Sequence, residues 1–134
     1  MPVLPSRLVY YTSPPRSRGE HTWGSCAMAL RGRRLLDVAR RFGPDVIHGH
    51  WAIPSGDVAV RIARALGVPC VVSVHGYDIA LTPAISGAAR LAVKRVLSGA
   101  DLVIANSRQT REAAAVLSGG NARIRTLWQG GDAV

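Results

Sequence analysis

Histidine residues follow two apolar stretches of the chain at the points where those stretches end. Val46 and Ile47 lead into "HGHW", residues 48–51, and "VVSV", residues 71–74, leads into "HGYD", residues 75–78. Imidazole donates and accepts hydrogen bonds near neutral pH, ligates metal ions and acts as a general acid or base. It also serves as an ordinary hydrogen-bonded side chain inside a core. A metal site, a catalytic or binding site, and core packing are therefore the explanations to weigh.

A zinc site is the weakest of these explanations. Zinc takes three or four nitrogen, sulfur or oxygen ligands in a tetrahedral arrangement. His48, His50 and His75 could supply three nitrogens, but neither a carboxylate nor a cysteine completes the set. Cys26 and Cys70 lie far apart without a metal-ligand spacing, and we interpret them as two reduced thiols. We expect no metal at the histidines.

Other motifs with known chemistry are weaker than the histidines. The segment "GSC", residues 24–26, lacks the strand–turn–helix context of a serine nucleophile elbow. Neither a G-x-G-x-x-G pattern nor a P-loop pattern occurs, so the sequence does not favour dinucleotide binding. We expect His48, which lies deeper in its stretch than His50, to be a hydrogen-bonded residue of the core. The same explanation stays open for His50.

Four segments that share one pattern must position these side chains. Each opens on glycine, runs apolar and ends polar, and the four are "GPDVIHGH", "GVPCVVSVHG", "GADLVIANS" and "GNARIRTLWQGG". Apolar residues between them recur at helical spacing, which predicts helices. The residues that share a helical face are Leu35, Ala39 and Phe42, then Val58, Ile62 and Leu66, then Ile85, Ala89, Ala92 and Val96.

The expected helix ends agree with this alternation. A last helix over about 108–118 follows Ser107, which is a good N-cap residue. Glycines that we expect as helix C-caps are Gly43, Gly67, Gly99 and Gly119 or Gly120. Strands that alternate with helices predict right-handed βαβ units and a parallel sheet with helices on both faces. Four units are too few for a barrel, so we expect an open, doubly wound, Rossmann-like α/β sheet.

The polar ends of the four segments meet at one edge of such a sheet. Ligands of open parallel sheets bind outside the carboxyl ends of the strands. Those ends carry His50 and Trp51, His75 and Gly76, Asn106 and Ser107, and finally Gln129, Gly130, Gly131 and Asp132. Polar groups and small glycines at one edge suit a polyhydroxylated or phosphorylated ligand.

The chain of 134 residues, 48% of them hydrophobic, is long enough for one globular core and too short for two ordinary domains. We expect residues 1–30 to be a loop-rich, poorly packed segment with a strand near 7–12, and residues 31–134 to be the α/β domain. No apolar run reaches the roughly 20 residues of a membrane span, and the start lacks a signal-peptide pattern. We therefore expect a cytoplasmic protein.

The charge is strongly positive, with a net of +9 that comes from sixteen arginines and the single lysine Lys94. Such a balance attracts anions, which include nucleic acids, anionic membrane surfaces and phosphate-bearing substrates. A solvated helix face is the plainer explanation. Aromatic residues do not interleave with the basic ones, so we expect no nucleic-acid partner.

Four successive blocks resemble the amino-terminal domain of family 4 glycosyltransferases, which have the two-domain GT-B fold. The blocks are "PDVIHGHWAIPSG", "GVPCVVSVHGYDI", "ADLVIANS" and "IRTLWQGGD", and the resemblance covers roughly residues 43–132. It implies transfer of a sugar from a nucleotide-sugar donor with retention at the anomeric carbon, without a cofactor or essential metal. It also implies that this domain receives the acceptor, a glycan or a lipid-linked sugar, while a carboxy-terminal domain holds the nucleotide.

The resemblance implies roles for individual residues. His75 matches the family histidine that faces the donor sugar and is the catalytic candidate, and Gly76 lets the backbone approach that sugar. His50 and Trp51 match the strand end that lines the acceptor side. The further substrate-binding candidates are Asp78, Asn106, Ser107, Gln129 and Gly130. Gln129 stands where the family commonly has asparagine, and Gly131 where it has an apolar residue.

The same resemblance indicates that donor-binding parts are missing. The family begins with a strand and a Gly-Gly loop at the donor phosphates, and its second domain carries paired glutamates that grip the donor. We expect this chain to be a fragment that is inactive alone, with peripheral contact to an anionic membrane at its inner face. Two alternatives stay open, a nucleotide-sugar epimerase of similar two-domain build and a non-catalytic module that binds sugar or phosphate.

Overall fold

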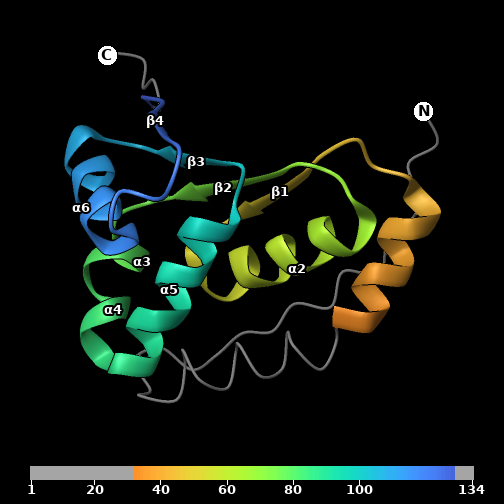
Figure 1. Cartoon of the computed structure of the whole chain (residues 1–134), viewed down its shortest axis with the longest axis horizontal. Helices are drawn as coiled ribbons and strands as arrows, with labels where there is room; N and C mark the ends of the chain where they lie inside the picture. Colours follow the sequence, from red (N-terminus) through yellow and green to blue (C-terminus); the bar gives the residue numbers. More distant parts are fainter. Residues whose placement is uncertain (1–31, 129–134) are drawn as a thin grey trace, which may run out of the picture.

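Four short parallel strands form one open sheet in the part of the chain that the computed structural model describes, residues 32–128. They are β1 (Ile47–His50), β2 (Cys70–Val74), β3 (Leu102–Ala105) and β4 (Ile124–Thr126), and they lie side by side in that order (Figure 1). Every neighbouring pair is parallel, so all four strands end at the same edge. The predicted open parallel α/β sheet is confirmed.

Three predictions concern residues outside this described range. They are the strand near 7–12, the loop-rich segment 1–30, and the roles of Gln129 and Gly130 with the residues that follow them.

Helices connect the strands, as the alternating pattern predicts. A helix over residues 32–42 precedes β1. A wide helical turn, η1 (Ala52–Gly56), and α2 (Asp57–Leu66) lead from β1 to β2. Three helices, α3 (Tyr77–Ala80), α4 (Thr82–Ile85) and α5 (Gly87–Gly99), lead from β2 to β3, and α6 (Arg108–Ser118) leads from β3 to β4.

The caps of α2 and α6 are as predicted. Ser107 Oγ accepts a hydrogen bond from the Thr110 N–H at 3.1 Å, and α6 begins at the next residue. Gly67 and Gly119 take the left-handed conformation just after α2 and α6, which is the usual glycine cap. Gly99 does not have this role, because α5 includes it and Ala100 follows in an extended conformation.

The single helix face predicted from Ile85 to Val96 is wrong, because the chain divides into two helices at Ser86. Ser86 is extended (φ −163°, ψ 160°), and its Oγ accepts a hydrogen bond from the Ala89 N–H at 3.1 Å. Ile85 therefore belongs to α4 and is exposed, whereas α5 buries Val93, Val96 and Leu97. Apolar spacing continues through residue 86, but a serine N-cap starts a new helix there.

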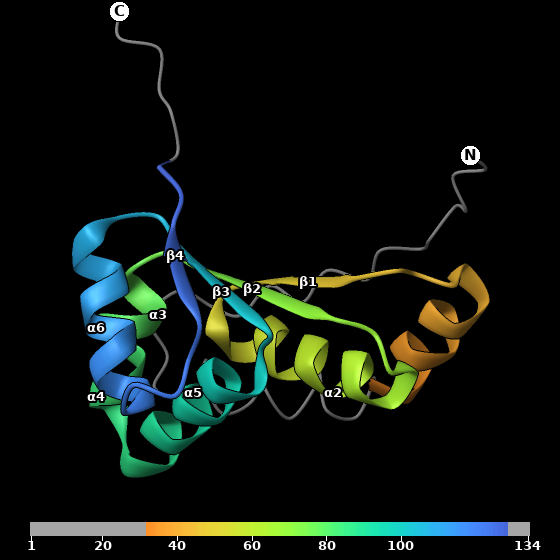
Figure 2. The same cartoon turned by 45° about the horizontal axis from the view of Figure 1, so that its top comes forward.

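The core lies between the sheet and the helices α2 and α5, which both views place on the same side of the strands (Figure 1 and Figure 2). Alternate strand residues point into it, and Val72, Val74 and Val103 are fully buried. A Cβ on Gly49 would lie only 2.9 Å from the Ala59 Cβ, so this glycine lets α2 approach β1 closely. This close packing on the buried face fixes β1, and the candidate site begins at the last residues of β1.

The opposite face of the sheet is less covered within the described residues. His48, Val71 and Leu102 share one row of the sheet, and His48 is exposed while the other two are half-buried. We predicted helices on both faces of the sheet, and the described residues 32–128 place helices over one face. The prediction that His48 belongs to the core is therefore wrong for this part of the chain, because no described helix lies over its side of β1.

The helix over residues 32–42 forms where predicted, at the end of the sheet where β1 begins (Figure 1). Two members of its expected core face are exposed, Leu35 at 38% and Phe42 at 58%. Its apolar face is therefore not buried by the described residues, although its spacing is that of a packed helix.

Candidate functional site

Trp51 is the first residue after β1 and has an unusual backbone conformation. Its φ is 72° and its ψ is 137°, a region that side-chain-bearing residues rarely occupy. The Trp51 N–H donates to the Ser73 carbonyl at 2.8 Å, and the Trp51 carbonyl accepts from the Gly56 N–H at 2.9 Å. Both sides of the peptide are thus fixed, while the indole remains 42% exposed.

Three imidazoles form a row beside Trp51. The His48 and His50 ring centroids are 4.4 Å apart, and the His50 and His75 rings stack at 5.7 Å with 19° between their planes. His50 Nδ1 lies 3.4 Å from His75 Nε2, and His48 Nε2 lies 2.8 Å from Ser73 Oγ. The two strand ends that the sequence singles out therefore do bring their histidines together.

The electrostatics of this row oppose protonation of His48. Desolvation of the ring lowers the pKa of His48 below the ordinary 6.5, and the neighbouring His50 and His75 lower it further when they carry charge. A neutral His48 can keep its hydrogen bond with Ser73 in either tautomer, because the serine hydroxyl both donates and accepts.

Asp78 links the ends of β1 and β2 from beneath. The residue is only 1% exposed. Its Oδ1 accepts a hydrogen bond from the His75 N–H at 3.0 Å, and its Oδ2 accepts one from the Ala52 N–H at 2.7 Å. Asp78, a substrate-binding candidate, therefore bonds to the backbone on both sides of the site. These two bonds set the spacing between Trp51 and His75.

The end of β3 supports His75 from the other side. Asn106 Nδ2 donates to the His75 carbonyl at 3.3 Å, and the Thr110 hydroxyl donates to Asn106 Oδ1 at 3.0 Å. The Ser107 hydroxyl donates to Thr110 Oγ1 at 2.9 Å, which completes a chain of hydrogen bonds. Asn106 and Ser107 therefore lie at the same edge as the histidines, as predicted.

Gly76 has a backbone conformation that favours glycine. Its φ of +100° is one that residues with side chains rarely adopt, and a Cβ there would lie 3.5 Å from Thr110 Oγ1. Thr110 was not among the candidates from sequence. The sequence signal for Thr110 was the N-cap Ser107 three residues earlier. An N-cap side chain bonds to the third residue of its helix, which here is Thr110.

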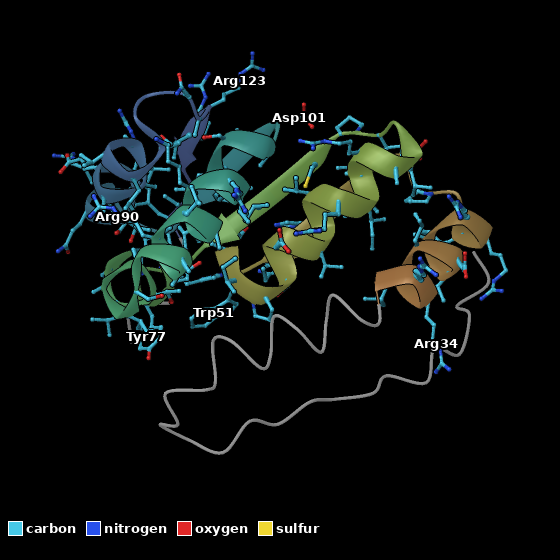
Figure 3. All side chains as sticks on the ribbon, turned by 60° about the horizontal axis from the view of Figure 1, so that its bottom comes forward. Arg34, Trp51, Tyr77, Arg90, Asp101 and Arg123 are labelled. Carbon is cyan, nitrogen blue, oxygen red and sulfur yellow. The ribbon has the colours of Figure 1, made fainter. Side chains whose placement is uncertain are left out.

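Tyr77 is a second residue that the sequence-based candidates omit. It follows Gly76 directly, is 48% exposed, and its ring packs against the Trp51 ring in a T-shaped arrangement with 6.2 Å between centroids. Figure 3 shows the two rings beside each other. The available signal was its position within "HGYD", since a residue next to a site histidine at a strand end shares its edge.

Among residues 32–128, no three His, Cys, Asp or Glu side chains are arranged to hold a metal ion. None of the helices within that range has the length and hydrophobicity that crossing a bilayer requires.

The site thus combines hydrogen-bonding imidazoles with two large exposed rings on a firmly held backbone. Imidazoles suit hydroxyl groups and developing positive charge, and ring faces suit apolar C–H groups. Such a surface can bind a sugar, which carries both kinds of group.

Comparisons with known proteins agree with that chemistry. Residues 2–129 match the family described as "Glycosyl transferase 4-like domain". The chain is also 37% identical over 117 residues to the protein named "Putative teichuronic acid biosynthesis glycosyltransferase TuaC" of Bacillus subtilis (strain 168). That alignment covers 87% of this chain and 29% of the relative, so the chain spans less than a third of the relative's length.

Proposed function

Because the chain belongs to the family of glycosyl transferase 4-like domains, we propose that it forms the acceptor side of an enzyme that transfers a sugar from a nucleotide-sugar donor. In this proposal the acceptor is a glycan or a lipid-linked sugar, and the anomeric configuration of the donor is retained. The position of His75 is the observation that carries the proposal. Its backbone is held on both sides, by Asp78 and by Asn106, and its ring lies among His50 and Trp51.

We propose that His75 is the catalytic residue of this transfer. Cleavage of the donor bond leaves positive charge on the sugar ring, and an imidazole held against that ring can stabilise the charge and hydrogen-bond a hydroxyl. His50 and Trp51 then contact the acceptor, while Gly76 allows close approach of the donor sugar. The inter-strand hydrogen bonds of Asp78 and Asn106 support this assignment because they hold the His75 backbone and do not use its ring.

The test is transfer by an enzyme that contains this chain together with a nucleotide-sugar domain. His75→Ala is expected to lower kcat about a hundredfold, the usual scale for one positioned polar group, with acceptor KM little changed. Phe42→Ala, an exposed residue at the other end of the sheet, is the control and should behave as wild type. The anomeric proton coupling of the product, read by NMR, checks retention. A His75→Ala enzyme with normal kcat would remove this residue from catalysis.

The same experiment separates the alternative functions. Release of an epimerised nucleotide sugar without transfer would favour an epimerase. Sugar binding without any turnover of the donor would favour a non-catalytic module. Inversion of the anomeric centre would leave a transferase but overturn the retaining mechanism.

We also propose contact with an anionic membrane surface through the outer side of α5. Arg90, Lys94 and Arg95 are exposed on this helix, and Leu91 between them is 48% exposed; Figure 3 labels Arg90. Basic residues near an anionic surface contribute roughly 1 kcal/mol each, and an apolar residue among them can enter the headgroup region. This arrangement is what supports a membrane-bound acceptor.

Sedimentation with lipid vesicles tests that contact. The chain is expected to bind vesicles with 30% phosphatidylglycerol about tenfold more tightly than vesicles of phosphatidylcholine alone, and salt should weaken the binding. Replacement of Arg90, Lys94 and Arg95 by Gln should abolish the preference. Replacement of Arg33, Arg34 and Arg40 by Gln is the charge-matched control. Equal loss in both triple variants would indicate a general effect of net charge, and equal binding to duplex DNA would favour a polyanion of another class.

A further inference from the structure

Two exposed aromatic rings from different strand ends meet at the site. Trp51 comes from the end of β1 and Tyr77 from the start of α3 after β2, and their centroids lie 6.2 Å apart at an interplanar angle of 64°. The Trp51 ring also lies 5.6 Å from the His75 ring. Nearly half of each aromatic residue is exposed. Figure 3 shows both at the same part of the surface.

Hydrogen bonds fix the backbone at both rings before any ligand arrives. Both peptide groups of Trp51 are hydrogen-bonded, although its positive φ is a conformation that persists only where the surroundings enforce it. Tyr77 stands between Gly76 and the buried Asp78, whose carboxylate is bonded to the backbone of both strand ends. A surface held in this way loses little conformational freedom when it binds a ligand.

The chemistry of these rings selects the ligand. An aromatic face carries negative charge density, which attracts the polarised C–H groups on one face of a pyranose. Imidazoles at the edge of the rings can donate to and accept from the hydroxyls of the same sugar. The arrangement places both types of group side by side, since the His75 ring lies 5.7 Å from the His50 ring and 5.6 Å from the Trp51 ring.

We propose that Trp51 and Tyr77 form a platform for a pyranose ring of the acceptor: the sugar stacks on the Trp51 face, the Tyr77 ring at 64° to that face contacts the side of the sugar, and the His50 imidazole bonds to its hydroxyls. This assignment rests on the proposed transferase function and makes Tyr77 a residue that determines acceptor specificity. Trp51 is expected to carry the larger part of the binding, because the indole offers the larger face. The donor sugar belongs at His75, beyond the platform.

Steady-state kinetics of the enzyme that contains this chain test the platform. Tyr77→Leu keeps apolar bulk but removes the ring, and is expected to raise the acceptor KM about tenfold with donor KM and kcat within about twofold of wild type. Tyr77→Phe keeps the ring and is expected to recover most of the acceptor affinity that Tyr77→Leu loses. Phe42→Leu is the matched control, because it makes the same aromatic-to-leucine change at an exposed residue far along the chain.

A rise in donor KM in place of acceptor KM would overturn the proposal and move the rings to the donor side, where a nucleotide base can also stack. Unchanged constants in Tyr77→Leu would overturn it as well. Thermal unfolding of each variant identifies a folding failure. If a ring variant does not fold, binding of the sugar probes by the unsubstituted chain decides the question.

Binding is measured by saturation-transfer difference NMR on the 134-residue chain with methyl β-D-glucopyranoside and chitobiose as probes. Irradiation of aromatic protons, which belong to three Trp, three Tyr, one Phe and four His residues, saturates the protein away from the sugar resonances. We expect saturation of the axial C–H protons of the sugars, and its loss in Trp51→Leu and Tyr77→Leu but not in Phe42→Leu. Absence of transfer to both sugars would overturn the platform.

The two measurements also separate this proposal from the proposed function. If the enzyme transfers no sugar from any nucleotide-sugar donor while the chain still binds the probes through Trp51 and Tyr77, the transferase proposal fails and the platform stands as a sugar-binding site. If transfer occurs but the ring variants leave acceptor KM unchanged, the platform fails and the transferase stands.

Discussion

At the scale of single residues, three histidines of similar sequence context have three different surroundings. His48 bonds to Ser73 on the exposed face of the sheet, His50 stacks on His75, and His75 has its backbone fixed by two other elements. The two strands that end on histidine are neighbours in the sheet. His50 pairs with Ser73, which lies two residues before His75, so the two histidines come close together. The rings meet in one row, and we propose that the row serves a sugar.

The pH dependence of stability is a prediction about His48. Since its pKa is lowered in the folded protein, the unfolded chain binds more protons below pH 6.5. The contribution of neutral His48 is therefore complete above pH 6.5 and is lost as the pH falls through the folded pKa. His48→Gln, which can still bond to Ser73, is expected to lose less Tm than wild type between pH 7.5 and 5.5. Equal losses in the two proteins would show that His48 is not the titrating group.

At the scale of elements, short helices and close contacts place the site. The break at Ser86 turns the chain after α4, and the glycines at helix and strand contacts let backbones approach. Asp78 and Asn106 then connect the ends of three strands through backbone groups. Positions on different elements are thus held to within hydrogen-bond tolerance, which a binding site requires.

Two glycines of α5 provide a prediction about packing. A Cβ on Gly99 would lie 2.9 Å from Val60 Cγ1 of α2, whereas Gly87 has open space. Gly99→Ala is expected to lower the free energy of unfolding by about 1–3 kcal/mol through overpacking, despite the better helix propensity of alanine. Gly87→Ala, at the other end of the same helix, should be neutral or stabilise by up to about 1 kcal/mol. Urea denaturation measures both, and equal effects would mean that α2 yields to the new methyl group.

At the scale of the whole molecule, one face of the sheet carries most of the core. Val72, Val74 and Val103 are buried beneath α2 and α5, while the row with His48 and Leu102 is open within the described residues. The candidate site lies at the edge of the sheet where the four strands end. The alignment with the Bacillus subtilis relative covers only 29% of that relative's length.

Turnover by the chain alone is a prediction at this scale. We assign the nucleotide to a domain other than the described one, so the purified 134-residue chain is expected to transfer or hydrolyse nucleotide sugars far below an ordinary enzyme rate. Release of labelled nucleotide diphosphate measures this rate, with the enzyme that contains a nucleotide-sugar domain as the positive control. A kcat of about 1 s⁻¹ or more for the chain alone would contradict the assignment.

Much of the architecture follows from the sequence by itself. Glycine-bounded apolar runs and helical spacing predict the four strands, α2 and α6, because periodicity and caps report interactions between residues that are near in the chain. The polar strand ends predict an edge site, and four ordered blocks indicate the family that residues 2–129 match. Ser107 as the N-cap of α6 is a local prediction that the structure confirms.

Only the tertiary structure decides what depends on contacts between distant segments. It places Tyr77 against Trp51 and gives both oxygens of Asp78 to backbone N–H groups 26 and 3 residues away. It also exposes His48, which we predicted to be core, because burial depends on what covers a face and alternation along a strand does not report that. Residue spacing within a segment reports only interactions along the chain. The register between neighbouring strands decides which side chains from different strands share a site.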